Sequence, residues 1–151
     1  MKAVFDADLL STFSNISRLD ILNDLFQDIL VPPSVVLEMK NAQIKFSTSH
    51  TRNAKLTREE LLSLRNMDPR LGRGERECLA IAGLRMMALA SDDKIVHQMC
   101  KKENIDYLSL PRILRLAILS KVMDRKDVQD IVRMVERRER TVIRNQKEIF
   151  K

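Results

Sequence analysis

The sequence predicts an α/β fold with three layers, α/β/α, in which a small central parallel sheet lies between helices. Short apolar runs alternate along the chain with longer segments of helical spacing, and this alternation is typical of a parallel sheet covered on both faces. The predicted strands are Lys2–Phe5, Ile29–Val31, Met86–Ala90 and Tyr107–Leu110. The chain has 151 residues with only three Gly and four Pro, which indicates few tight turns and many helices. This length suits a single domain.

The helices predicted in the N-terminal half follow the first two strands. Apolar residues recur at helical spacing in residues 9–13 and again in residues 19–26. Two prolines close the second strand and begin a helix over residues 32–39, since Pro is favoured in a first helical turn. Residues 41–56 are polar and without a pattern, and we interpret them as a loop or weak hairpin. A Thr-x-x-Glu capping box begins a helix over residues 57–65.

The C-terminal half is predicted to contain four more helices. Gly74 opens one that is rich in small and apolar residues, and residues 94–103 and 111–122 form the next two. Asp124 caps the last helix, which runs from Arg125 to about Ile149 and keeps a partial apolar stripe. This long terminal helix is the one candidate for a partly independent element.

Charge is unevenly distributed along the chain. Residues 1–111 contain 15 Lys and Arg against 15 Asp and Glu, whereas residues 112–151 contain 12 against 6, which accounts for the formal net charge of +6. A neutral body with a basic C-terminal quarter indicates either a polyanionic partner near that end or a solvated helix with interspersed charges. Both interpretations stay open on this feature alone.

Composition also bears on the compartment. There is no apolar run of about 18 residues and no N-terminal charged-then-apolar segment, so we expect neither membrane insertion nor secretion. The two cysteines, Cys78 and Cys100, are too few for a disulfide framework or a zinc site. We expect reduced, buried thiols and a cytoplasmic protein. His50 and His97 have no motif around them and receive no role.

Carboxylates follow two of the predicted strands. Asp6 and Asp8 come after the first strand, and Asp92 and Asp93 come after the strand Met86–Ala90. In an open parallel sheet, ligands bind beyond the carboxyl ends of the strands. We therefore expect these four acids at one edge of the sheet.

Two further acids lie in apolar surroundings. Glu38 follows Val-Val-Leu, and Glu75 opens a largely apolar helix. A half-buried carboxylate is unfavourable unless it is paired or bound to a metal. Converging carboxylates attract a hard cation, and Mg²⁺ or Mn²⁺ takes oxygen ligands and bridges to phosphate. Such an ion activates water and stabilises charge on a phosphoryl group, so the pattern favours metal-dependent hydrolysis of a phosphodiester.

Each acid also has a simpler interpretation. Asp8 or Asp92 alone would be a helix N-cap, since Asp is favoured there. Glu75 would interact with its helix dipole, and Glu77 would be a surface acid paired with an Arg four residues before it. Glu38 would be an exposed helix position. These interpretations are harder to accept for all the acids together.

Four segments carry a resemblance to a known family. They are VFDADLL at 4–10, VPPSVVLEM at 31–39, GRGERECLAIA at 72–82 and LASDDKIVHQMCKKENIDYLSL at 89–110. In this order and spacing they resemble the PIN-domain nucleases, in particular the compact prokaryotic group that includes the VapC-type toxin ribonucleases. The resemblance covers about residues 1–122.

The resemblance implies a PIN-like fold and a metal site. Carried onto this sequence, the catalytic and metal-binding carboxylates are Asp6, Glu38, Glu75 and Asp93. The secondary candidates are Asp8, Asp92 and Glu77, and Asp8 departs from the family's usual Ser, Thr or Asn. The resemblance further implies Mg²⁺ or Mn²⁺ as cofactor, RNA as substrate, and a toxin with a cognate antitoxin protein.

The resemblance also implies a homodimer. We expect the helices within residues 8–26 and 111–122 to support it, because their Leu- and Ile-rich faces exceed what one small sheet covers.

We interpret residues 1–122 as a PIN-like nuclease domain and residues 123–151 as a C-terminal helical extension packed on the same domain. On one long helix, basic residues three, four or seven apart align as a continuous strip that could follow RNA phosphates. The predicted nucleic-acid-binding strip consists of Arg133, Arg137, Arg140, Arg144 and Lys147. The alternative is a solvated helix whose Arg side chains cover core or partner surface. With no Trp and one Tyr, backbone contacts should dominate over base stacking.

Two other functions stay open. A phosphatase of the haloacid dehalogenase type also requires Asp-x-Asp after a first strand, and Asp6 and Asp8 supply it. Against this, Leu-Leu follows where that group has small or hydroxylated residues, and Glu38 and Glu75 would have no role. The other alternative is a catalytically weak PIN-like module that binds RNA or protein through its basic helix.

Overall fold

The computed structural model describes residues 1–151, and its centre is a five-stranded sheet in which all neighbouring strands are parallel. The strands are β1 (Lys2–Phe5), β2 (Asp28–Val31), β3 (Thr51–Asn53), β4 (Ala88–Ala90) and β5 (Tyr107–Leu108). Their order across the sheet is β3-β2-β1-β4-β5. Val4 of the central strand β1 is fully buried and lies opposite Leu30 of β2 and Leu89 of β4.

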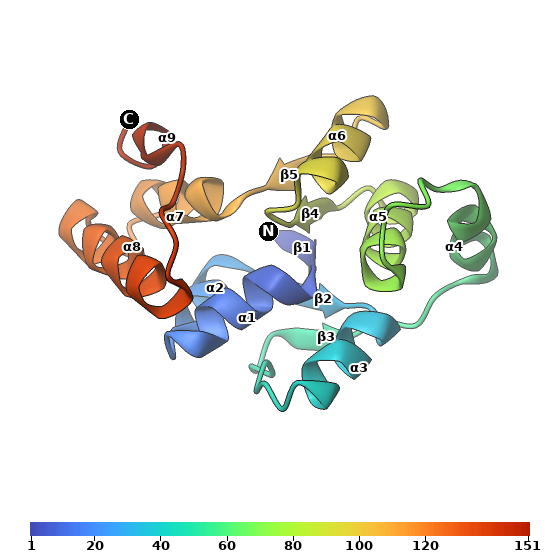
Figure 1. The fold of residues 1–151 in the computed structure, drawn as a ribbon, viewed down its shortest axis with the longest axis horizontal. Helices are drawn as coiled ribbons and strands as arrows, with labels where there is room; N and C mark the ends of the chain where they lie inside the picture. The colour runs from blue at the N-terminus through green and yellow to red at the C-terminus, as the bar shows by residue number, and fades with distance from the viewer.

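Helices cover both faces of this sheet (Figure 1). They are α1 (Ala7–Asn15), α2 (Leu19–Leu25), α3 (Pro33–Asn41), α4 (Arg58–Ser63), the 3-10 helix η1 (Leu64–Asn66), α5 (Arg73–Arg85), α6 (Lys94–Lys102), α7 (Leu110–Leu119), α8 (Arg125–Glu139) and α9 (Gln146–Ile149). Helix α1 contacts α2, α3 and α8, whereas α5 contacts α4 and α6 and also meets α3. The chain runs from β1 toward β3 and later toward β5. Because crossovers between parallel strands are right-handed as a rule, the helices of these two halves belong on opposite faces. The predicted three-layer fold is confirmed.

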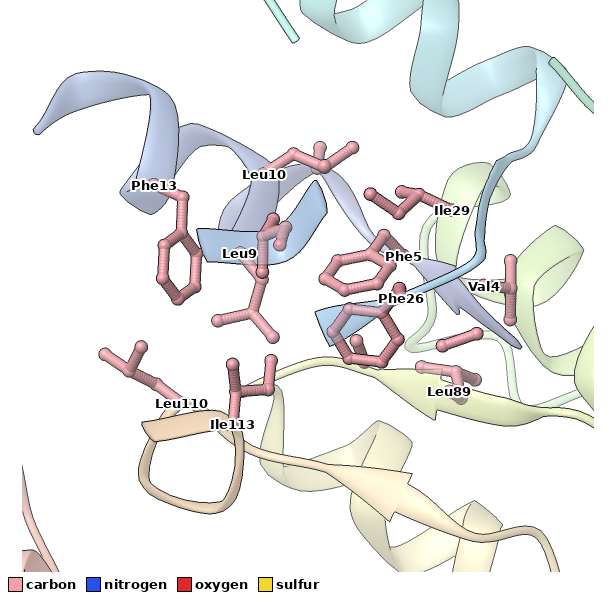
Figure 2. Close-up of a cluster of buried hydrophobic side chains, with 14 of the residues drawn as sticks. Val4, Phe5, Leu9, Leu10, Phe13, Phe26, Ile29, Leu89, Leu110 and Ile113 are labelled. Atoms are coloured by element: carbon pink, nitrogen blue, oxygen red, sulfur yellow. The ribbon is translucent and has the colours of Figure 1, made fainter. Parts of the chain in front are cut away.

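The hydrophobic core joins β1 to the helices on the α1 side of the sheet. Figure 2 shows Phe5 of β1 against Phe26, with the ring planes at 88° and the centroids 5.1 Å apart. Leu9 and Phe13 of α1 and Ile113 of α7 belong to the same buried cluster. Burying a side chain of this size contributes about 1.5–3 kcal/mol. The packing holds α1 against the end of β1 and so fixes the backbone between them.

Residues 41–56 differ from the prediction. Instead of a loop or hairpin they include β3, which pairs in parallel with β2 at the edge of the sheet. Backbone groups make this pairing, for example the Ala54 N–H that donates to the Val31 carbonyl at 2.9 Å. Arg52 and Asn53 are exposed, so the strand has no apolar pattern that the sequence could display.

Two other strands are shorter than predicted. The strand expected at Met86–Ala90 begins at Ala88, because Met86 has a left-handed backbone (φ 56°) and ends α5 with its side chain 93% exposed. The strand β5 stops early because Ser109 caps α7, its hydroxyl accepting a hydrogen bond from the Arg112 N–H at 3.3 Å.

The predicted helix from Arg125 to about Ile149 is wrong in its second half. Helix α8 ends at Glu139, Arg140 has a left-handed backbone (φ 51°), and the chain turns before α9. The Glu136 carboxylate stabilises the turn by accepting a hydrogen bond from the Ile143 N–H at 2.9 Å. The five predicted basic residues therefore do not form a continuous strip, since two of them lie beyond the turn.

The C-terminal extension packs against the rest of the chain. Its apolar stripe, Val128, Ile131, Val132 and Val135, is buried in the same core cluster as β1. Helix α8 contacts α1 and α7, and α9 contacts α7. The predicted cap is confirmed, because the Asp124 carboxylate accepts a hydrogen bond from the N–H three residues on.

The expectation of exposed apolar faces is wrong for the helices within residues 8–26, whose large apolar side chains are buried or half-buried. Within residues 111–122, Leu119 is the one large apolar side chain that is exposed. Large exposed apolar side chains occur instead on α3, α4 and the end of α5, namely Leu37, Leu61, Leu62, Leu84 and Met86. Both cysteines are free and buried, as predicted. No helix combines the length and the apolar character that crossing a membrane requires.

Candidate active site

The first candidate acid, Asp6, lies where β1 ends and α1 begins. Its Oδ1 accepts a hydrogen bond from the Leu9 N–H at 3.0 Å, so its carboxylate caps α1, and the residue is only 5% exposed. Its own N–H donates to the Ala90 carbonyl at 3.1 Å, which links this position to β4. The capping role that the sequence allowed for Asp8 belongs to Asp6, and Asp8 is exposed in the first turn.

Ser91, Asp92 and Asp93 occupy the equivalent place after β4. The Asp93 N–H donates to the buried Ser91 hydroxyl at 3.0 Å, and Asp93 Oδ1 accepts from the Val96 N–H at 2.9 Å. Asp93 is thus the cap of α6, a role that the sequence allowed for Asp92. The Asp92 carboxylate instead accepts a hydrogen bond from the Leu110 N–H at 2.8 Å, at the start of α7. Backbone amides therefore hold both acids.

A cleft of about 180 Å³ brings acids from separate segments together. The acids that line it are Asp6, Asp8, Glu38 and Glu75. They come from the start of α1, from α3 and from α5. Gly74 permits the close approach of the last two helices, because a Cβ at this position would lie 3.2 Å from Val35 Cγ2. Four of the sequence-predicted acids therefore share one cleft, which we term the acidic cleft.

Burial and neighbouring charges keep Asp6 unusually basic. Burial raises the pKa of Asp6 to about 7, hydrogen bonds from Ser91 and the Leu9 amide oppose the rise, and repulsion from Asp8 and Asp92 adds to it. Near neutral pH this carboxyl is therefore half protonated. The protein tolerates a buried acid here because the proton neutralises it.

Glu75 shows that the remaining acids face the same space. Burial raises the pKa of Glu75, a hydrogen bond from the Gly72 N–H opposes this, and the charges of Asp93, Asp8 and Glu38 raise it further. Asp93 does not line the acidic cleft but lies near enough to repel Glu75 across its edge. The cluster is thus an array of mutually repelling oxygen donors.

These donors fit a hard divalent cation by their chemistry. All are carboxylate oxygens, the ligand type that Mg²⁺ and Mn²⁺ prefer. As the side chains lie, no three His, Cys, Asp or Glu residues are close enough to hold one ion. Asp6 and Asp93 each use only Oδ1 in capping, and Glu75 uses Oε2 toward Gly72 at 3.2 Å. Each side chain has a second carboxylate oxygen that its helix cap does not use.

Glu77, a secondary metal candidate, has a different place. It is 2% exposed and does not line the acidic cleft. Its Oε1 accepts from the Ser34 N–H at 2.9 Å, and its Oε2 accepts from the Ser34 hydroxyl and from Arg73 Nε, the latter at 2.8 Å. The predicted pairing with Arg73 is confirmed, but the acid is buried rather than on the surface. With both oxygens engaged, Glu77 joins α5 to the start of α3.

Arg73 is the functional candidate that sequence reasoning missed. It is the one cation among the residues that line the acidic cleft, and its side chain is about half exposed. The i, i+4 spacing from Glu77 was visible in the sequence, but the direction of the guanidinium was not. Nothing in the sequence singled out Ser34, which completes the contact.

The residues predicted to bind nucleic acid are divided by the turn after α8. Arg137 and Arg140 share a hollow with Arg138, which lay outside the predicted strip. Arg133 instead lies 3.7 Å from Asp130, Arg144 lines a cleft that also contains Asp92, and Lys147 lies on α9.

A larger cleft lies away from these acids. It has a volume of about 690 Å³, lies between η1, α5 and α6, and contains none of the candidate acids. The converging carboxylates, rather than the volume of a cavity, locate the candidate site in the smaller acidic cleft.

Comparisons with known proteins agree with this fold. A family model described as a PIN domain matches residues 2–151. Among solved structures, the fold is similar to a PilT N-terminus domain protein from the hyperthermophilic archaeon Sulfolobus solfataricus, with 17% sequence identity, a TM-score of 0.56, and coverage of 82% of this chain and 95% of that one. A search of curated proteins finds no match. PIN domains are generally nucleases that use divalent metals. Because the family model spans almost the whole sequence, this chain belongs to the PIN-domain family.

Proposed function

We propose that this protein is a metal-dependent endoribonuclease that hydrolyses RNA phosphodiester bonds with Mg²⁺ or Mn²⁺. The observation that carries the proposal is the acidic cleft, where carboxylates of three segments converge beside Asp93 at the carboxyl edge of the sheet. The residues that would hold the metal are Asp6, Glu38, Glu75 and Asp93, with Asp8 beside them. When bound, a divalent ion makes water a better nucleophile and offsets charge on the phosphodiester.

The chain's own groups prepare this cleft for the ion. Hydrogen bonds from the Leu9 N–H and Ser91 orient the Asp6 carboxylate. Because burial raises the pKa of Asp6 to about 7, cation binding displaces a proton from it, so metal affinity rises with pH through this range. Glu75 and Asp93 need only release their capping contacts in part, since each keeps a second oxygen.

Arg73 supplies the positive charge that an incoming phosphate requires. Its Nε is held by Glu77 at 2.8 Å, which leaves the two terminal nitrogens available to a non-bridging phosphate oxygen. Glu77 is in turn fixed by Ser34, so the guanidinium is oriented before substrate arrives. Arg73 would thus bind the scissile phosphate within the cleft that the candidate metal ligands line.

The choice of RNA rests on the resemblance to toxin ribonucleases and on the composition of the surface. No Trp is present, and the single Tyr is stacked on His97 (centroids 4.2 Å apart) and on Arg112 (4.3 Å). A stacked Tyr is a poor platform for bases, which supports recognition through the backbone.

The test is cleavage of a labelled RNA by the purified protein with EDTA, Mg²⁺ or Mn²⁺. We expect cleavage only with metal, and a loss of about a thousandfold or more in Asp6→Asn, since catalytic carboxylates contribute several kcal/mol. Asp106→Asn, an exposed acid remote from the cleft, is the matched control and should keep full activity. Equal cleavage by the two variants would contradict the proposal.

The same assay separates the alternatives. A haloacid-dehalogenase-like phosphatase would hydrolyse a small phosphate monoester, whereas the proposed nuclease ignores it. A catalytically weak binding module would retain RNA without cutting it. Calorimetric titration of Mg²⁺ or Mn²⁺, wild type against Asp93→Asn, tests metal binding apart from turnover.

We also propose the assembly that the resemblance implies, a homodimer and a toxin with an antitoxin partner. Exposed apolar side chains on α3, α4 and α5, including Leu37 and Met86, are what support self-association. Sedimentation should give a dimer at tens of micromolar, and a monomer would contradict it. Growth arrest on expression of wild type, absent with Asp6→Asn, tests the toxin role.

A further inference from the structure

A second charged hollow lies at the end of α1 opposite the acidic cleft. It has a volume of about 490 Å³. Its lining residues are Asn15, Ile16 and Ser17 at the end of α1 with Met134, Arg137, Arg138 and Arg140 from the end of α8. Three cations and no carboxylate therefore line one hollow, which we term the arginine hollow.

Two acids of the same segment are engaged in hydrogen bonds away from the arginines, Glu136 half-buried and Glu139 exposed. Glu136 accepts hydrogen bonds from the Ile143 N–H at 2.9 Å and from the Gln146 amide at 3.3 Å. Glu139 accepts one from the Thr12 hydroxyl at 2.7 Å. The arginines of the hollow are exposed and take part in no ion pair. The sequence mixes both charges here, but neither glutamate lines the hollow or forms an ion pair with its three arginines.

Helix α1 connects the arginine hollow to the acidic cleft. Asp8 lines the cleft and Asn15 lines the hollow. They are seven residues apart, so they lie on one face of the helix, about 10 Å apart along its axis. Ser11, which is half-exposed, lies between them on this face, and Thr12 beside it donates a hydrogen bond to the Glu139 carboxylate at 2.7 Å. Helix α1 lies between α8 and α3 in Figure 1, and both contact it.

We propose that Arg137, Arg138 and Arg140 form a second anchoring site that binds the phosphate backbone of the RNA strand whose scissile bond lies in the acidic cleft. The proposal rests on the proposed nuclease function and adds the path of its substrate along α1. Guanidinium groups match phosphate oxygens in geometry and stay charged at every physiological pH. A single strand is a flexible polyanion, so three exposed cations in one hollow suit it without reading its sequence.

The spacing predicts a dependence on substrate length. At about 3.4 Å per stacked nucleotide, the 10 Å between cleft and hollow correspond to about three nucleotides. An RNA of about 12 nucleotides reaches both sites, whereas one of about three cannot occupy both. The arginine hollow should therefore strengthen binding of the long probe alone.

The test measures binding of fluorescent RNA probes of these two lengths in EDTA, which prevents metal-dependent cleavage. The variant Arg137→Gln, Arg138→Gln, Arg140→Gln should lose about tenfold or more in affinity for the long probe and little for the short one. Its slope of log affinity against log salt should flatten by about two units, since each phosphate contact on a single strand contributes about 0.7. A triple Arg→Lys variant should recover most of the affinity.

The matched control is Arg65→Gln, Lys101→Gln, Lys126→Gln, which removes the same charge from exposed positions outside both sites. If control and test variants bind the long probe equally, or if the two probe lengths respond alike, the second anchoring site is wrong. The same holds if wild type binds neither probe, or if the test variant loses only thermal stability, since cations at a helix C-terminus also stabilise its dipole. Loss of binding to an acidic peptide but not to RNA would assign the hollow to a protein partner and overturn the proposal.

Failure of this site and failure of the nuclease proposal give different results. Metal-dependent cleavage with equal KM in the test and control variants would contradict the anchoring site and support the nuclease function. A loss of binding that depends on probe length, with no cleavage by the wild-type protein, would support the anchoring site and contradict the nuclease function.

Discussion

The two ends of helix α1 hold charge in opposite ways. At its N-terminus, Asp6 is buried, oriented by backbone and Ser91 hydrogen bonds, and repelled by its neighbours. At its C-terminus, the arginines lie exposed around an open hollow with no partner. Burying a charged side chain is unfavourable and restricts its motion. An exposed charged side chain remains solvated and mobile, and salt screens its interactions. The acids of the acidic cleft are therefore well oriented but destabilise the fold. The arginines of the hollow attract anions and destabilise the fold little.

The largest expected effect comes from removing the buried charge itself. Without metal, Asp6→Asn should raise the free energy of unfolding at pH 8 by on the order of 4 kcal/mol, because a rise in pKa from 3.8 to about 7 is worth about 1.4 kcal/mol per unit. Asn also caps helices well, so α1 should keep its start. Denaturant melts in EDTA measure the change.

The sign of this effect reverses the usual behaviour of an acid. The folded-state pKa of Asp6 is raised, so the stability that protonation contributes is fully present below about pH 3.8 and is lost as pH rises through about 7. Melts at pH 5 and pH 8 should therefore show a smaller gain for Asp6→Asn at pH 5. Divalent metal should reduce the difference in free energy of unfolding between Asp6→Asn and wild type at pH 8, since the cation replaces the proton as the partner of the wild-type carboxylate. A variant that melts much lower than wild type in EDTA would show a structural role for this carboxylate.

The next effect concerns the contact that fixes Arg73. Glu77→Gln should lower the free energy of unfolding by about 2 kcal/mol, because it weakens a buried, charge-assisted contact to Ser34 and Arg73. It should also lower kcat, since Arg73 loses its orientation.

Glu60 provides the matched control for that experiment. It is 1% exposed and pairs with Arg85 at 2.8 Å, in a capping box away from the acidic cleft. Burial raises the pKa of Glu60, but contacts with Arg85 and Thr57 outweigh it and lower the pKa overall. Glu60→Gln should destabilise the protein to a similar extent and leave kcat at wild-type level when measured below both melting points. An equal loss of kcat in both variants would mean that Glu77 acts only through stability.

The smallest expected effect on the fold comes from Arg73 itself. Arg73→Gln should lower the free energy of unfolding by about 1 kcal/mol, since the guanidinium is about half exposed and the buried Glu77 carboxylate keeps its hydrogen bonds from Ser34. The same change should lower kcat/KM by about tenfold, equivalent to about 1.4 kcal/mol. Single-turnover cleavage measures it, with Arg65→Gln as control. Unchanged kcat/KM would leave Arg73 with a role in packing alone.

Much of the architecture follows from the sequence because local patterns carry it. The central strands are continuous apolar runs, since both faces of a parallel sheet are buried. Helix starts were readable wherever a cap or a proline marks them, as at Thr57, Asp124 and Pro33. The edge strand β3 was not readable, because backbone hydrogen bonds to β2 make it and its side chains face solvent.

The candidate acids show the same boundary between local and tertiary information. Spacing after strands, together with the family resemblance, predicted Asp6, Glu38, Glu75 and Asp93, since residues after parallel strands gather at one edge. The resemblance placed Glu75 ahead of Glu77, and of the two only Glu75 lines the acidic cleft, because two residues along a helix point to different neighbours. Only the packing of α5 on α3 directs Glu77 to Ser34 and Arg73 to the acidic cleft.

The C-terminal segment shows most plainly what the sequence by itself determined and what the tertiary structure decided. The cap at Asp124, the buried stripe of α8 and the excess of positive charge are properties of neighbouring residues, and the sequence contains them. The end of helix α8 before Arg140 is not a property of neighbouring residues. It depends on the hydrogen bond from the Ile143 N–H to the Glu136 carboxylate and on the packing of α9 against α7. Helical periodicity continues in a sequence whether or not the helix does, whereas the alternative contacts exist only once the chain has folded. Those contacts turned a predicted strip of cations into a hollow beside α1.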